Sequence, residues 1–149
     1  MEYDVIKFGV VGFSKNAFDK KNAYQILDKI FTGIATKYPN TIIEIVSGYT
    51  NSGVPKIAYE LADKYGFVTV GFSAEQALEV SSGVYPVSKV ILKGERFGDE
   101  SEDFIRYIDH LIRVGGGPQS LMETEMFKQK QEQQEAESSL IEHEVEWLG

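Results

Sequence analysis

Residues Asp109 to Glu123 read DHLIRVGGGPQSLME, and this stretch decides the fold class. A short apolar segment, His110 to Val114, runs into three consecutive glycines, and a helix-forming segment with an early acid follows. A strand that turns through glycines into a helix directs backbone N–H groups and the positive end of the helix dipole at one spot, where an anionic group can bind. A second glycine-bearing turn, SGYTNSG, lies earlier, at Ser47 to Gly53. Two such turns in one small domain indicate a pocket for a nucleotide or a phosphosugar.

Apolar and amphipathic segments alternate along the rest of the chain. They predict strands at 5–13, 41–46, 67–72, 88–93 and 110–114, and helices at 22–38, 54–65, 74–80, 99–107 and from about 118 onward. The first strand is almost wholly apolar, which is typical of a strand buried on both faces of a parallel sheet. The alternation predicts an α/β fold, a three-layer Rossmann-like domain with a mostly parallel sheet of about five or more strands. Ligands bind beyond the carboxyl ends of such strands, where both glycine turns and Gly12 to Lys15 fall.

We assign residues 1–127 to a nucleotide-binding domain and residues 128–149 to a polar helical C-terminal tail rich in Gln and Glu. Two interpretations of the tail stay open. It is either a solvated extension of the last helix, or a segment whose apolar residues dock on the body or on a partner subunit. Those apolar residues are Leu140, Ile141, Val145, Trp147 and Leu148.

Composition argues against several classes of function. The chain has 149 residues, of which 42% are hydrophobic. It has no apolar run of the roughly 18 residues that a membrane span needs, so we expect no membrane partner. The net charge of −8 argues against nucleic-acid binding, which needs a basic surface. Cysteine is absent, and His110 and His143 have no partners at ligand spacing, so we predict no metal site and no cofactor. The acidic N-terminus does not resemble a signal peptide, and we expect a cytoplasmic protein.

Candidates for ligand contact come from three turns. They are Gly12 and Ser14 after the first strand, Gly48, Thr50, Asn51, Ser52 and Gly53 in the earlier turn, and Arg113, Gly115, Gly116, Gly117, Gln119 and Ser120 at the later turn. Three glycines in a row exceed what a sharp turn requires, which favours phosphate or sugar contact. Structural alternatives stay open elsewhere, because Ser52 suits a helix N-cap and Ser120 suits a bond to the start of a helix. No Gly-Lys-Ser/Thr phosphate loop is present, which argues against ATP hydrolysis of that type.

The two glycine turns resemble those of the SLOG superfamily, which includes the Lonely-guy proteins, formerly called lysine decarboxylase-like. The family fingerprint is Pro-Gly-Gly-x-Gly-Thr-x-x-Glu, and Gly115 to Glu123 corresponds to it. Gly115 replaces the proline, Gln119 the third glycine and Ser120 the threonine. The earlier turn is similar to the family's Ser-Gly-Gly-Gly-x-x-Gly-hydrophobic turn. The resemblance covers roughly Val5 to Phe127, with order and spacing kept.

The resemblance implies a Rossmann-like fold, a pocket for a nucleotide or nucleotide-derived ligand, and a homodimer or higher homo-oligomer. Lonely-guy proteins cleave the N-glycosidic bond of a nucleoside 5′-monophosphate, using the fingerprint glutamate and an upstream arginine. Glu123 matches that glutamate, and a carboxylate there suits the positive charge that develops on the sugar. The alternative for Glu123 is a surface acid favoured by the helix dipole. The family spacing places Glu100 near the arginine position, which leaves Arg96 or Arg113 for that role.

Two functions therefore remain open. The displaced arginine and the missing fingerprint glycine favour a protein that senses, carries or sequesters a nucleotide-derived ligand without turnover. The alternative is a phosphoribohydrolase with Glu123 and Arg96 as catalytic residues. A third and weaker interpretation is a structural protein whose tail mediates assembly.

Overall fold

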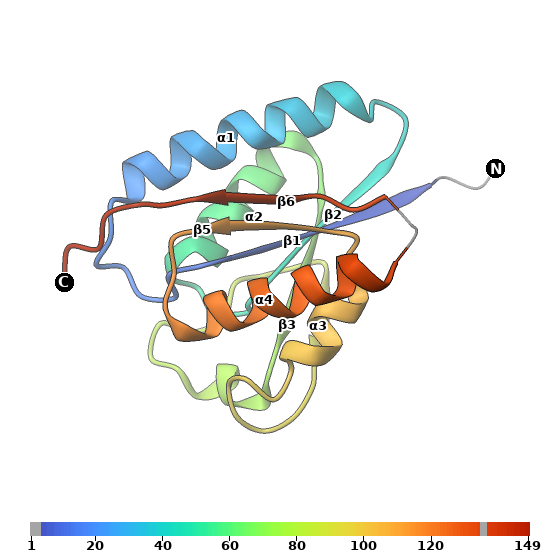
Figure 1. The fold of residues 1–149 in the computed structure, drawn as a ribbon. Coiled ribbons are helices and arrows are strands. Elements are labelled where there is room, and N and C mark those ends of the chain that lie inside the picture. The colour runs from blue at the N-terminus through green and yellow to red at the C-terminus, as the bar shows by residue number, and fades with distance from the viewer. Residues whose placement is uncertain (1–3, 135–136) are drawn as a thin grey trace.

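The computed structural model describes residues 4–134 and 137–149, and its centre is a parallel sheet (Figure 1). The strands are β1 (Val5–Gly12), β2 (Ile42–Ser47), β3 (Val68–Ser73), β4 (Lys89–Leu92), β5 (His110–Val114) and β6 (Leu140–His143). They lie in the order β4-β3-β2-β1-β5-β6, and all neighbouring strands are parallel. The predicted α/β fold with a mostly parallel sheet is confirmed.

In the described part of the chain, four α-helices and one short 3-10 helix join the strands. They are α1 (Lys20–Lys37), α2 (Gly53–Tyr65), η1 (Glu75–Glu79), α3 (Ser101–Tyr107) and α4 (Pro118–Gln133). Local sequence explains where they start and end. The Asp19 carboxylate accepts the N–H of Asn22 at 3.1 Å and caps α1. Gly66 ends α2 in the left-handed conformation, and Pro118 occupies the first turn of α4, where a missing N–H costs nothing.

The helices cover both faces of the sheet, so the fold has three layers (Figure 1). One face packs against α1 and α2 through a core centred on Leu27, Phe31, Ile45 and Leu61. The other packs against α3 and α4 through Phe72, Phe104, Leu111 and Phe127. Burial of these two apolar layers is the main stabilising contribution to such a domain.

The direction in which successive strands are added to the sheet reverses at β1. From β1 it adds β2, β3 and β4 on one side, then crosses to the other side and adds β5 and β6. The loops that leave β1 and β5 therefore turn to opposite faces of the sheet. Such a switch point opens a crevice at the carboxyl edge of the sheet, which is where doubly wound folds bind ligands.

The tail differs from the sequence prediction. Helix α4 continues to Gln133 as expected, but Leu140–His143 form β6 beside β5, so the predicted polar helical tail is wrong over this strand. Backbone bonds fix the pairing, with the Leu111 N–H donated to Ser139 O at 3.0 Å and the Gly115 N–H to His143 O at 2.8 Å. Without β6 the strand β5 would expose an unpaired edge next to the core, and the apolar Leu140 and Ile141 cover the two faces there.

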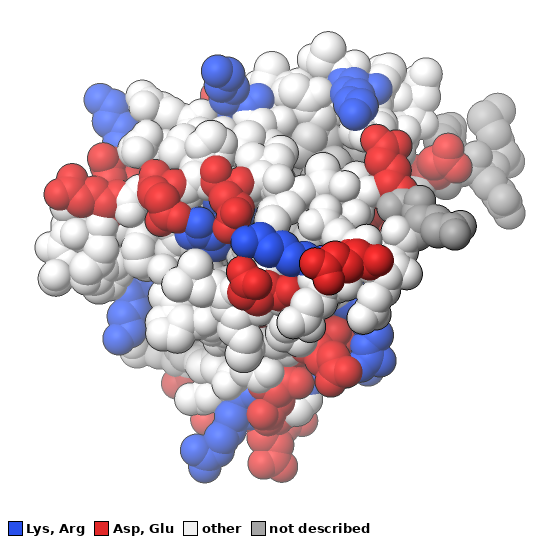
Figure 2. All heavy atoms as spheres, viewed as in Figure 1, with Lys and Arg blue, Asp and Glu red and all other residues white. Residues whose placement is uncertain are grey.

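Charge is unevenly distributed over the molecule. Figure 2 shows basic side chains along α1 and a row of acidic side chains along β6 and the segment that follows it. The acids in that segment are Glu142, Glu144 and Glu146. No helix among the described residues is long and apolar enough to cross a membrane.

Candidate ligand-binding pocket

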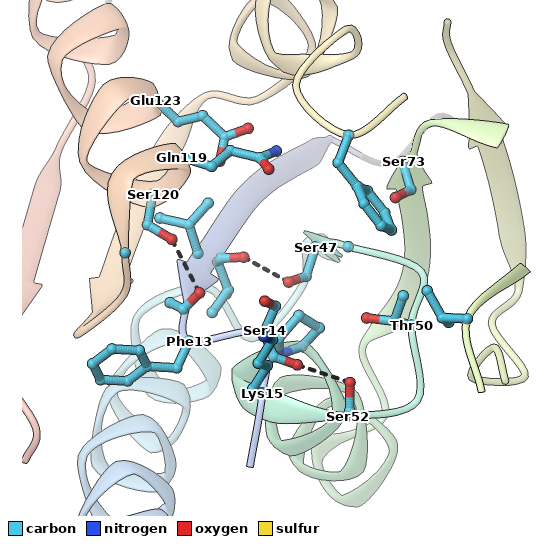
Figure 3. Close-up of a pocket in the computed structure, with 18 of the residues that line it drawn as sticks. Phe13, Ser14, Lys15, Ser47, Thr50, Ser52, Ser73, Gln119, Ser120 and Glu123 are labelled. Carbon is cyan, nitrogen blue, oxygen red and sulfur yellow. Dashed lines mark hydrogen bonds between the residues drawn. The ribbon is translucent and has the colours of Figure 1, made fainter. Parts of the chain in front are cut away.

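A cavity of about 690 Å³ opens at the switch point between β1 and β5 (Figure 3). We call it the switch-point pocket. Its walls come from the end of β1 and the loop after it, the β2–α2 turn, the residues after η1, the loop before α3, the start of α4 and the tail. The predicted site residues that line it are Gly12, Ser14, Gly48, Thr50, Ser52, Gly117, Gln119, Ser120 and Glu123. The structure thus brings residues from all three predicted turns to one cavity of a size that suits a small ligand.

Two serines, one at the start of α2 and one in α4, hold the end of β1 and the loop after it. Ser52, at the N-cap position of α2, donates its hydroxyl hydrogen to Ser14 O at 2.8 Å. Ser120, in the first turn of α4, donates to Gly12 O at 3.0 Å (Figure 3). A third serine, Ser47, donates to Val10 O at 2.6 Å. The hydroxyl hydrogens of the two predicted contact residues Ser52 and Ser120 are therefore already engaged by the protein, and they position the floor of the pocket.

Two predicted glycines are required by the backbone, one by close packing and one by its conformation. A Cβ atom on Gly12 would lie 2.3 Å from Val114 O, because β1 and β5 run close together there. Gly116 has a φ of 111°, a conformation that L side chains rarely adopt. Gly117 differs from both, since a Cβ atom at this position meets no atom within 4 Å. Gly117 is thus the member of the glycine run that leaves open space at the pocket wall.

The two helix N-termini at the pocket offer different numbers of free N–H groups. At α2, Gly53 donates to Asn16 Oδ1 at 2.9 Å and Val54 donates to Phe13 O at 2.7 Å. At α4, no residue in the described ranges accepts the N–H of Gly117, Gln119 or Ser120. An anion attracted by a helix dipole needs free donors, and the start of α4 is the end of the pocket that offers them. Lys15 lines the same cavity and is the cationic side chain among its lining residues.

An acidic cluster occupies another part of the wall. Glu123, only 6% exposed, accepts the Ser101 hydroxyl at 2.8 Å. Glu100, only 4% exposed, accepts the Gln119 amide at 2.9 Å and the Gly98 N–H at 3.0 Å. Burial, reinforced by the negative charge of Glu100, raises the pKa of Glu123 to about 7, although the bonds from Ser101 and Gln119 oppose this rise. Glu123 therefore exchanges a proton near neutral pH.

Neither predicted arginine lines the pocket. The Arg113 side chain reaches β6 and the segment after it, where it bonds to Glu142 and Glu144, and it also bonds to the Gly115 carbonyl. Arg96 is exposed in the loop before α3, which Asp99 closes by accepting the Arg96 N–H at 3.0 Å. The position that the family spacing assigned to an arginine is filled by Glu100, and Glu100 does line the pocket.

The remaining predicted residues lie in the turns without lining the cavity. They are Asn51, Gly53, Gly115 and Gly116. Asn51 donates its backbone N–H to Gly83 O at 3.0 Å, while its side-chain Oδ1 is buried without a hydrogen-bond partner in the described part of the chain. Gly115 donates to β6, so it serves the docking of the tail.

Several pocket residues were not predicted from the sequence. The aromatic ones are Phe13, Phe97 and Trp147, and the polar ones are Lys15, Ser47, Ser73, Ser81, Ser82 and Glu100. Trp147 reaches the pocket because the tail folds back. The centroid of its ring lies 5.0 Å from that of the Phe13 ring. The Leu148 N–H, donated to Ala17 O at 2.7 Å, holds this end of the tail. The position of Lys15 just after the first strand could have identified it as a pocket residue. Trp147 could not be identified in this way, because only the folded tail brings it to the pocket.

Solved structures of other proteins share this fold. The molybdenum cofactor binding protein of the phototrophic bacterium Rippkaea orientalis aligns with a TM-score of 0.65 and 23% identity, over 96% of this chain and 78% of that one. The TM1055 protein gives 0.63 and 19%, over 82% and 68%. The molybdenum cofactor carrier protein of Chlamydomonas reinhardtii gives 0.62 and 18%, over 93% and 76%. The chain matches no protein-family model and no curated protein. At these identities the likeness is one of fold.

Proposed function

We propose that this protein binds and carries a phosphate-bearing heterocyclic ligand in the switch-point pocket and releases it intact. The observation that carries the proposal is the free N–H groups of Gly117, Gln119 and Ser120, which border the same cavity as Lys15. Backbone donors at a helix start together with one lysine match the charge and geometry of a phosphate. No group of three His, Cys, Asp or Glu side chains suited to a metal ion occurs within residues 4–134 and 137–149.

The apolar walls favour a flat ring system on the same ligand. Phe13, Phe97 and Trp147 border the cavity, and the Trp147 ring already lies against Phe13. Aromatic side chains stack on heterocycles with little loss of conformational entropy. A cavity of about 690 Å³ accommodates a phosphate, a short linker and such a ring together.

Two lines of comparison agree with this ligand class. The glycine turns resemble those of the SLOG superfamily, whose members bind nucleotides and nucleotide-derived ligands. Two of the fold neighbours are described as proteins that bind or carry the molybdenum cofactor, whose organic part is a phosphate-bearing pterin. Nucleotides and pterin phosphates share the anionic group and the ring, so both are candidate cargoes.

Carrying is favoured over hydrolysis by the cluster around Glu123. The resemblance calls for an arginine beside this glutamate, and Glu100 stands there instead. A second carboxylate repels a phosphate rather than holding it for reaction, and Arg96 and Arg113 lie outside the pocket lining. One observation keeps hydrolysis as a second candidate: the pKa of Glu123 is raised to about 7, which suits general acid–base catalysis.

Trp147 provides a direct test because it is the single tryptophan of the chain and lines the pocket. The protein is titrated with AMP, GMP, ADP-ribose, neopterin monophosphate and inorganic phosphate while tryptophan emission is followed. Equilibrium dialysis then measures affinity, and chromatography of the dialysed ligand reports whether it is intact.

We expect at least one heterocyclic monophosphate to quench Trp147 and to be recovered unchanged. Lys15→Ala should weaken that binding about tenfold, whereas Lys128→Ala, at an exposed lysine of α4, should not. Release of a free base would overturn carrying in favour of the hydrolase. Absence of binding by every compound in the panel would overturn the pocket assignment itself.

A further inference from the structure

The switch-point pocket has two chemically opposite regions. One, on the loop after β1, holds Lys15 and so presents positive charge. The other holds Glu123 and Gln119, and Figure 3 shows their side chains at the far end of the view from Lys15. A ligand that fills both regions must be anionic at one end and rich in hydrogen-bond donors at the other.

The region around Glu123 has more acceptors than donors. The donors supplied by the protein are the Ser101 hydroxyl, the Gly98 N–H and the amide of Gln119. Each carboxylate oxygen of Glu100 and Glu123 can accept two hydrogen bonds, so lone pairs remain after these donors are used. Both residues are more than nine-tenths buried, so donors for these lone pairs come from the cavity side.

Glu100 fixes the orientation of the Gln119 side-chain amide. A carboxylate only accepts hydrogen bonds, so the NH₂ end of Gln119 is the end that faces Glu100 at 2.9 Å. The amide oxygen of Gln119 is thereby left as a further acceptor at the pocket wall. Glu100 itself is held by the Gly98 N–H, which makes it a positioning residue for this wall.

Resting on the proposed function, we infer that Glu123 and Gln119 recognise the donor edge of a 2-amino-4-oxopyrimidine ring, the unit that guanine and pterins share. On this edge a ring N–H and the neighbouring exocyclic amino group point the same way. A carboxylate accepts both donors at once, and the Gln119 oxygen accepts the second amino hydrogen. Adenine presents a ring nitrogen acceptor beside its amino group, and hypoxanthine lacks the 2-amino group, so neither supplies the same pair of donors.

The same arrangement sets the direction of the bound ligand. Glu100 and Glu123 repel a phosphate, while Lys15 attracts it. The ring therefore enters toward Glu123, and the phosphate stays beside Lys15. Phe13 and Trp147 line the same pocket and offer aromatic faces to the ring or its linker.

The test compares ligands that differ by single groups. Dissociation constants for GMP, IMP and AMP are measured by equilibrium dialysis with the wild-type protein, Glu123→Gln and Glu125→Gln. IMP differs from GMP only by the missing 2-amino group. Glu125 is the matched control because it lies on α4 but is exposed and paired with Lys128 at 3.1 Å. Neopterin monophosphate is measured in parallel to separate a pterin cargo from a guanine cargo.

We expect GMP to bind at least about tenfold more tightly than IMP, and AMP to bind least. Glu123→Gln should reduce the GMP-to-IMP ratio to near one, while Glu125→Gln should keep it. Tighter binding of neopterin monophosphate than of GMP, with the same loss in Glu123→Gln, would assign the site to pterins. The reverse order would assign it to guanine.

Three results would overturn the inference. The first is equal affinity of the wild-type protein for GMP, IMP and AMP, which would leave the proposed carrier function intact. The second is an equal loss of GMP and IMP binding in Glu123→Gln. The third is GMP binding that requires Mg²⁺ in the wild-type protein but not in Glu123→Gln. The carboxylate cluster would then hold a cation instead of the ring. Failure of every monophosphate to bind would instead overturn the proposed function on which the inference rests.

Discussion

The Nε atom of Arg113 on β5 lies 2.9 Å from Oε1 of Glu142 on β6. The Arg113 side chain is 7% exposed and also bonds to Glu144 and to Gly115 O. These bonds join the body to the segment that brings Trp147 to the pocket. Arg113, which the sequence analysis proposed as a phosphate-binding residue, therefore holds the tail against the body.

The first prediction concerns this link. Glu142→Gln removes the charge that pairs with a buried guanidinium, so we expect the free energy of unfolding to fall by about 1–2 kcal/mol. Urea denaturation followed by far-UV circular dichroism measures it. Glu146→Gln, at an exposed acid in the same segment, should change stability by less than about 0.5 kcal/mol. Equal effects of the two substitutions would show that the Arg113 pair does not stabilise the tail.

The second prediction concerns the pH dependence that Glu123 imposes. Its pKa is raised from 4.5 to about 7 in the folded protein, so between these values the folded state binds more protons than the unfolded state. The stability of the wild-type protein therefore falls as pH rises from about 4.5 to 7. Glu123→Gln removes this loss and keeps a partner for Ser101. We expect the variant to be more stable than wild type at pH 8, by on the order of 3 kcal/mol, and equally stable near pH 4.

Unfolding free energies at a series of pH values test this, with Glu125→Gln as the exposed control on the same helix. A difference between wild type and Glu123→Gln that stayed constant with pH would contradict the raised pKa.

The third prediction concerns His110 and the start of β6. Nδ1 of His110 accepts the Ser139 N–H at 2.9 Å, and burial lowers the pKa of the imidazole. A histidine with a lowered folded pKa makes the unfolded state bind more protons once pH falls below about 6.5, so stability is lost toward acid. Relative to His110→Phe, the wild-type protein should lose stability between pH 7 and pH 5. Ser139→Ala, which keeps the backbone N–H, should retain the wild-type slope, and parallel slopes for wild type and His110→Phe would refute this role.

The fourth prediction separates two glycines of the pocket. Gly12→Ala places a Cβ atom 2.3 Å from Val114 O, so we expect a loss of roughly 1–3 kcal/mol in stability, measured by thermal denaturation. Gly117→Ala meets no atom within 4 Å and should leave stability nearly unchanged. It should still weaken ligand binding, because the added methyl group occupies the pocket wall. Unchanged affinity in Gly117→Ala would show that the ligand does not approach this turn.

The sequence could locate the pocket but not assign the roles of its residues. Periodicity and the glycine turns placed three segments at the carboxyl edge, and Glu123, Gln119, Ser52 and Ser120 do line one cavity there. The sequence could not show that the Ser120 hydroxyl donates to the end of β1 and the Ser52 hydroxyl to the loop after it, because such partners lie far apart in the chain. Nor could it show which way the Arg113 side chain points, because its partners Glu142 and Glu144 lie in the tail, which reaches β5 only in the folded protein.

By itself the sequence determined the alternation of strands and helices, the parallel sheet and the edge at which a ligand can bind. These follow from local periodicity, glycine and proline signals, and the requirement that apolar faces be buried. Only the tertiary structure decided that the tail adds β6 and that Trp147, rather than an arginine, completes the pocket wall. The reason is that Leu140–His143 have a weak local preference of their own, and the unpaired edge of β5 supplies the hydrogen bonds that make them a strand.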